Sequence, residues 1–165
     1  MRICILETGG TINGILDPEA PPPANSRVLA WLQEHASRLQ LECDSQLIVM
    51  KDSRAIDSDD RAQLAAAIEA QPAQHILIPH GTYTMPETGL YLRAHLGADA
   101  LRKKIILVGS LVPLGEPGSD APGALEFAVE NLRAGPDGVW IAMGERLWHP
   151  GEVVKDAVSG RYVTR

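Results

Sequence analysis

Five short apolar runs, separated by stretches with helical patterning, constrain the fold of this chain most strongly. The runs occupy residues 3–6, 45–50, 75–78, 104–109 and 139–143. Short apolar runs are typical of buried strands, and strands that alternate with helices form a parallel sheet covered on both faces. The pattern therefore predicts an α/β three-layer sandwich with a mainly parallel sheet, flavodoxin-like in general form. No internal repeat or linker interrupts it, so residues 1–165 are predicted to form a single domain.

Capping and turn residues set the expected ends of the helices. Asn25 or Ser26 can cap a helix that runs to about residue 39, and Ser58 can cap a second one that closes at Gln71-Pro72. A third helix is expected from Pro86 to about residue 95, and a fourth over residues 124–132. Beyond residue 143, glycines and prolines separate short extended pieces, so the tail is predicted to form a short hairpin region.

Composition and charge narrow the classes of partner. Hydrophobic residues make up 45% of the chain, which indicates a globular protein. Aromatic residues make up only 4% and the net charge is −6, so no nucleic-acid partner is expected. No apolar run approaches the roughly 18 residues of a membrane helix, and no signal segment opens the chain. A cytoplasmic protein with no membrane partner is therefore predicted. Cys4 and Cys43 are expected to be reduced thiols.

Three of the first four predicted strands end in turns that carry hydroxyl groups. These turns are Thr-Gly-Gly-Thr at 8–11, Asp-Ser at 52–53 and Gly-Thr-Tyr-Thr at 81–84. The carboxyl ends of parallel strands share one edge of a sheet, so the three turns predict a site for a small polar ligand. The chain has no phosphate-binding glycine loop and no histidine or cysteine spacing typical of a metal site, so no cofactor or metal is expected.

A hydroxyl-based site without a metal or nucleotide points to acyl transfer or amide hydrolysis. Thr11 is the candidate nucleophile, because it stands on a glycine turn just beyond the first predicted strand. The alternative is that Thr8 and Thr11 only cap this turn through bonds to the backbone.

Five stretches of the sequence carry a family resemblance. They are TGGTI at 8–12, KDS at 51–53, HGTYTMPET at 80–88, GSLVPL with SDAPG at 109–123, and VVK at 153–155. In this order they resemble the N-terminal domain of the bacterial L-asparaginase/glutaminase family. The usual second domain is absent from the sequence, which in length is similar to the short, single-domain asparaginases.

The resemblance implies a reaction and a set of residue roles. The implied activity is an amidohydrolase that releases ammonia from L-asparagine or a related small amide, without a metal, as a homodimer or homotetramer. Thr11 matches the nucleophile, and Thr82 with Lys155 matches the second catalytic group; the alternative for Lys155 is a plain surface lysine. Ser53 matches the residue that binds the substrate α-carboxylate. The implied substrate-binding set is Gly10, Asp52, Ser53, Gly81, Tyr83 and Ser110.

Two departures from the family pattern leave the activity open. Tyr83 stands where the family has an aspartate that binds the substrate α-ammonium, and a phenol is neutral near pH 7. The loop at 13–24 has three consecutive prolines and lacks the catalytic tyrosine that the family has there. Tyr83 either supplies the missing phenol or simply fills the pocket. The alternatives to asparagine hydrolysis are a catalytically weak or inactive amino-acid or small-amide binding protein, and an amidase whose substrate lacks a free α-ammonium.

Overall fold

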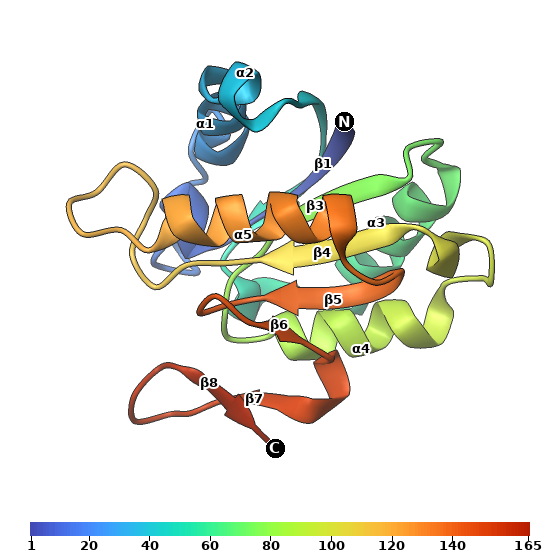
Figure 1. Ribbon diagram of the computed structural model, residues 1–165. Coiled ribbons are helices and arrows are strands. Elements are labelled where there is room, and N and C mark those ends of the chain that lie inside the picture. Colours follow the sequence, from blue (N-terminus) through green and yellow to red (C-terminus); the bar gives the residue numbers. More distant parts are fainter.

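A six-stranded, mainly parallel sheet forms the middle layer of the computed structural model, which describes residues 1–165 (Figure 1). Its order is β2-β1-β3-β4-β5-β6, and only β6 runs antiparallel to its neighbour. The strands are β1 (Arg2–Gly9), β2 (Glu42–Lys51), β3 (His75–Pro79), β4 (Lys104–Val108), β5 (Gly138–Ala142) and β6 (Leu147–Trp148). The predicted α/β sandwich with a mainly parallel sheet is confirmed.

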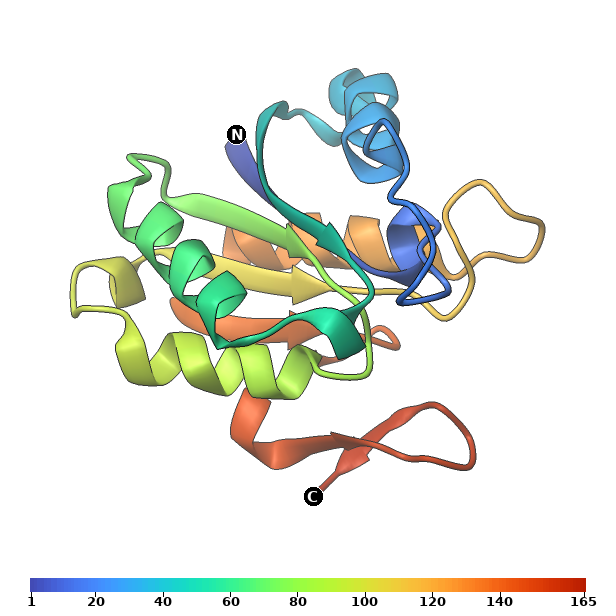
Figure 2. The ribbon, with the colours of Figure 1, turned by 180° about the vertical axis from the view of Figure 1, so that it is seen from behind.

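Helices cover both faces of the sheet (Figures 1 and 2). One face packs against α1 (Arg27–Glu34), α2 (Ala36–Leu39) and α5 (Ala121–Ala134), and the other against α3 (Ser58–Ala70) and α4 (Met85–His95). Short 3-10 turns complete the described elements: η1 (Thr11–Asn13), η2 (Ser53–Ala55), η3 (Ala100–Arg102) and η4 (Pro150–Glu152). None of these helices combines the length and apolarity needed to cross a membrane.

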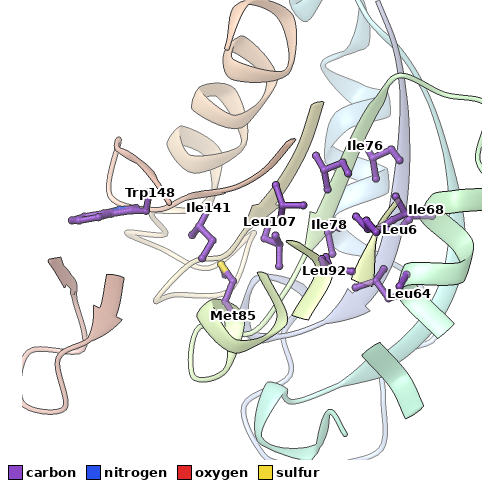
Figure 3. Packing of buried hydrophobic residues seen from close by; sticks show 14 of the residues in the cluster. Leu6, Leu64, Ile68, Ile76, Ile78, Met85, Leu92, Leu107, Ile141 and Trp148 are labelled. Carbon is purple, nitrogen blue, oxygen red and sulfur yellow. The ribbon is translucent and has the colours of Figure 1, made fainter. Parts of the chain in front are cut away.

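The first strand explains why residues 3–6 are apolar without interruption. Ile3 and Ile5 belong to the core beneath α1 and α5, whereas Cys4 and Leu6 belong to the core beneath α3 and α4. Side chains of a strand point alternately to the two faces of a sheet, so a strand covered on both sides needs apolar residues at every position. Figure 3 shows Leu6 packed among Leu64, Ile68 and Leu92 in the second of these cores.

The strand order creates a crevice at the carboxyl ends of β1 and β3. The chain leaves β1 toward α1 on one face, and it leaves β3 toward α4 on the other face (Figures 1 and 2). Neighbouring strands whose connections diverge in this way form the topological switch point of flavodoxin-like sheets, where ligands bind. The predicted turn at 8–11 begins in the last two residues of β1, and the predicted turn at 81–84 follows β3.

Three helix boundaries differ from the prediction. The expected helix up to about residue 39 is interrupted at His35, whose ψ of 5° is not helical and whose Nδ1 bonds to the carbonyl oxygen of Trp31. Ser26 caps α1 as predicted, but the cap of α3 is Asp57 rather than Ser58. Helix α5 begins at residue 121 rather than 124, because Pro122 is accommodated in its first turn, where no backbone N–H is needed.

The predicted C-terminal hairpin is formed by β7 (Val153–Lys155) and β8 (Tyr162–Thr164), which pair antiparallel in a small separate sheet. Figure 2 shows it beside the main domain, beyond α4. Val153 and Tyr162 are buried in the core shared with α4. The hydroxyl of Tyr162 also donates a hydrogen bond of 2.7 Å to the carbonyl oxygen of Thr82. These contacts hold the hairpin against the end of β3.

Candidate active site at the carboxyl ends of the strands

A cavity of about 190 Å³ lies at the predicted edge of the sheet. It is lined by Thr11, Leu16, Asp52, Arg54, Thr82, Tyr83, Ser110, Leu111 and Lys155. Six of the nine predicted site residues are among them, and they come from the ends of β1, β2, β3 and β4 and from the hairpin. The other three, Gly10, Ser53 and Gly81, do not line the cavity.

Gly10, Gly81 and Ser53 instead form the close contact between three turns. A Cβ atom on Gly10, whose φ is +82°, would overlap the backbone amide of Gly81. A Cβ atom on Gly81 would lie 2.6 Å from the Oγ atom of Ser53. Ser53 is 1% exposed, and its carbonyl oxygen accepts a hydrogen bond of 2.7 Å from the hydroxyl of Thr84. The two glycines thus allow the turns after β1, β2 and β3 to touch.

Thr11 begins η1 and is partly exposed to the cavity. The hydroxyl of Thr8 donates a hydrogen bond to the carbonyl oxygen of Pro79 on β3 rather than within the turn. The interpretation as a turn cap is therefore wrong for Thr8.

The side chain of Asn13 holds the turn that carries Thr11. Its Oδ1 accepts hydrogen bonds from the backbone amides of Arg27 and Val28 at the start of α1, at 3.0 and 3.3 Å. Its Nδ2 donates to Oε2 of Glu7, which is 2% exposed. Burial raises the pKa of the Glu7 carboxyl, and its other oxygen, Oε1, has no hydrogen-bond partner. Glu7 was not among the predicted site residues, because it lies within an otherwise apolar strand.

Thr82 and Lys155 meet although they lie 73 residues apart in the chain. The Lys155 Nζ atom donates a hydrogen bond of 2.8 Å to Oγ1 of Thr82, which is 3% exposed. Burial lowers the pKa of Lys155, and the positive charge of Arg54 lowers it further, while the carboxylate of Asp52 opposes the change. A lysine in these surroundings gives up its proton more readily than one in water. The alternative of a plain surface lysine is wrong, because Lys155 is half-buried in the cavity wall.

Tyr83 forms an exposed wall of the cavity. The residue is 55% exposed. The centroid of its ring lies 3.6 Å from the Nζ atom of Lys155 and 4.6 Å from the guanidinium carbon of Arg54. The negative face of an aromatic ring attracts cations at these distances. The ring thus packs against both positive charges of the cavity.

Arg54 is a cavity residue that the sequence analysis missed. Its Nε and Nη2 atoms donate to the two carboxylate oxygens of Asp52, each at 2.9 Å, and its backbone amide donates to Oδ1 at 2.8 Å. These hydrogen bonds hold the pKa of Asp52 below its usual value. The signal was available, since the arginine directly follows the predicted Asp-Ser turn. Leu16 and Leu111, which also line the cavity, were missed as well.

Ser110 lies at the end of β4, where it is 1% exposed. Its hydroxyl donates a hydrogen bond of 2.7 Å to the carbonyl oxygen of Val112, so this group stabilises the following loop. The structure contains no group of three or more histidine, cysteine or acidic side chains placed to hold a metal ion.

A family model described as "Asparaginase, N-terminal" matches residues 2–163. The chain belongs to the asparaginase family. Among curated proteins, it is 26% identical over 154 residues to an L-asparaginase of Thermococcus kodakarensis, covering 89% of this chain and 45% of that protein. It is 28% identical over 167 residues to a probable periplasmic L-asparaginase of Haemophilus influenzae, covering 96% of this chain and 47% of that protein.

Solved structures show the same relationship. The crystal structure of a probable cytoplasmic L-asparaginase from Campylobacter jejuni superposes with a TM-score of 0.82 at 25% identity, covering 99% of this chain and 52% of that one. The thermostable L-asparaginase from Thermococcus kodakarensis gives a TM-score of 0.77 at 25% identity, covering 99% and 51%. The chain therefore spans about half the length of the asparaginases it matches.

Proposed function

We propose that this member of the asparaginase family is an amidohydrolase that releases ammonia from L-asparagine or a related small amide, with Thr11 as the nucleophile. One observation carries the proposal: the lysine–threonine pair of Lys155 and Thr82 lines the same small cavity as Thr11. A hydroxyl is a weak nucleophile until a neighbouring group takes up its proton, and this pair offers such a group.

The proposed reaction has two steps. The Oγ atom of Thr11 bonds to the amide carbon, the carbon–nitrogen bond breaks, and the hydroxyl proton passes to the leaving nitrogen, which departs as ammonia. Water then adds to the acyl-threonine ester and restores the hydroxyl while the acid leaves. In both steps Lys155 accepts and returns the proton through Thr82, a role that its lowered pKa supports.

The remaining predicted residues shape the binding site in this proposal. Ser53 is assigned to the substrate carboxylate, as the family resemblance implies; in the structure it is 1% exposed and does not line the cavity. Gly10 and Gly81 allow the close approach of the turns, and Asp52, Tyr83 and Ser110 form walls of the cavity.

The wider setting of the enzyme is also part of the proposal. We propose a single functional domain over residues 1–165, assembled as a homodimer or homotetramer in the cytoplasm. The related proteins named above include one described as cytoplasmic and one described as periplasmic.

Replacement of the nucleophile tests the proposed function. Ammonia release from L-asparagine and a panel of small amides is measured for the wild type, Thr11→Ala, Thr11→Ser and Thr164→Ala. Thr11→Ala is expected to lower kcat by about 10³-fold or more, as loss of a nucleophile does. Thr11→Ser keeps a hydroxyl and is expected to retain part of the activity. Thr164, an exposed residue of β8 outside the cavity, serves as the control for loss of a threonine hydroxyl.

Two outcomes would contradict the proposal. Unchanged turnover in a folded Thr11→Ala variant would remove Thr11 from the nucleophile role and leave Thr82 as the candidate. Absence of ammonia from every amide, together with amino-acid binding in calorimetry, would favour the binding protein instead.

A further inference from the structure

We propose that the site prefers a carboxylate-bearing amide without a free ammonium group, and that Arg54 sets this preference. This inference rests on the proposed amidohydrolase function and specifies its substrate class: the monoamide of a short dicarboxylic acid. Succinamate is the simplest member, since it is L-asparagine with the α-ammonium group replaced by hydrogen.

The charges that line the cavity carry the argument. Three charged side chains line it, and Asp52 is the only carboxylate among them. Both oxygens of that carboxylate already accept N–H groups of Arg54, each at 2.9 Å. Such a two-point pair between guanidinium and carboxylate is geometrically specific, and Asp52 is 5% exposed. A substrate ammonium would have to compete with a guanidinium that is already in place.

The two basic side chains of the cavity disfavour a substrate ammonium and favour a substrate carboxylate. Arg54 and Lys155 both line the cavity, and both lie against the ring of Tyr83. Tyr83 adds no carboxylate to offset them, and its ring already lies against both of these basic side chains. A substrate ammonium would therefore meet the permanent positive charge of Arg54, and that of Lys155 whenever its amine is protonated, but no unpaired anion, whereas a substrate carboxylate is attracted. Like-charge contacts and unpaired charges are the usual means by which a site rejects a ligand.

Arg54 is the specificity-determining residue because its side chain acts twice. It contributes a positive charge, and it occupies the one carboxylate that could receive an ammonium. Arg54→Gln removes the charge, keeps a polar but shorter side chain, and removes the guanidinium from the oxygens of Asp52. Asp52 keeps the hydrogen bond from the backbone amide of residue 54, so the variant retains a support for this carboxylate.

The test compares kcat/KM for ammonia release from succinamate and from L-asparagine. The wild type is expected to prefer succinamate by at least about tenfold, the scale of one hydrogen bond to a charged group. Arg54→Gln is expected to shift this ratio toward L-asparagine by about tenfold or more. Arg2→Gln is the matched control, because it also removes an arginine that pairs with an aspartate, at 2.7 Å, but at the amino end of β1. It is expected to leave the ratio unchanged.

The outcomes separate this inference from the proposed function. If ammonia is released but the wild-type preference for succinamate is below about tenfold, the inference is wrong and the proposed function stands. An equal ratio in Arg54→Gln and Arg2→Gln removes Arg54 from the specificity role. If no amide is hydrolysed, the proposed function fails, and calorimetry of the wild type with both ligands decides the preference. Tighter binding of succinamate supports the inference. Tighter binding of L-asparagine, or equal binding of the two ligands, overturns it.

Discussion

Tyr162→Phe is expected to loosen the C-terminal hairpin while the main domain stays intact. Tyr162 is 8% exposed, and burial raises the pKa of its phenol, so its hydroxyl is a donor at every working pH. That hydroxyl bonds at 2.7 Å to the carbonyl oxygen of Thr82, which lies 80 residues away in the chain. Phenylalanine keeps the ring in the core, and the variant therefore loses the hydrogen bond without opening a cavity.

The size of the effect follows from the acceptor that is left behind. A buried polar group without its partner costs about 1–3 kcal/mol. The hairpin consists of two strands of three residues each, and two-stranded hairpins are marginal by themselves. The loss is therefore expected to act locally, and about 1–3 kcal/mol corresponds to a roughly 5- to 150-fold rise in the equilibrium constant for hairpin opening. Opening also separates Lys155 on β7 from Thr82.

Amide hydrogen exchange measures this opening directly. The amide of Asp156, which bonds to the carbonyl oxygen of Arg161 across the hairpin, is expected to exchange faster in Tyr162→Phe by the stated factor. Amides of β4 are expected to keep their protection. Tyr91→Phe is the control, because that partly buried ring lies in α4 and stacks on His95 of the same helix. Unchanged exchange in the hairpin, or an equal loss of protection in β4, would refute the local reasoning.

Four further predictions concern the cap, the pH dependence and the cavity. Ser26→Ala removes the oxygen that accepts a hydrogen bond from the amide of Leu29, the third residue of α1. The free energy of unfolding, measured in urea, is expected to fall by about 1 kcal/mol, whereas Ser26→Asn is expected to retain most of that stability. Burial lowers the pKa of His80 from 6.5 to about 4, so the unfolded chain binds more protons between these values. Stability should therefore fall by up to about 3 kcal/mol as pH drops through this window, and a flat profile in wild type, or an equal slope in His80→Gln, would contradict it. Because the pKa of Lys155 lies below 10.5, kcat should rise with pH through an apparent pKa below that value, and Arg54→Gln should move this pKa upward. Tyr83→Asp should raise kcat/KM for L-asparagine, and more so in the Arg54→Gln background, where fewer cations compete for the new carboxylate; a fall in kcat with KM unchanged or lower would instead make Tyr83 catalytic.

Much of the fold was predictable because its signals are local. The uninterrupted apolar residues at 3–6 indicate a strand buried on both faces, and this requirement holds whatever the neighbours are. Glycines at 9 and 10 mark the turn after it, where positive φ angles of 100° and 82° are found. The helix boundaries were less predictable. Asp57 and Ser58 are both good caps, and only the backbone geometry selects Asp57.

The sequence by itself determined which residues reach the carboxyl edge of the sheet, since Thr11 and Thr82 each follow a strand of a parallel βα pattern. Only the tertiary structure decided what these residues touch there. The hydrogen bond between Lys155 and Thr82 depends on a hairpin that folds back onto β3, and no periodicity in the chain encodes that path. The same holds for the position of Tyr83 against Lys155 and Arg54, whereas the pairing of Asp52 with Arg54 lies within one turn and is local in the sequence. Periodicity reports which face a side chain occupies, whereas its charge partners depend on how separate turns meet in space.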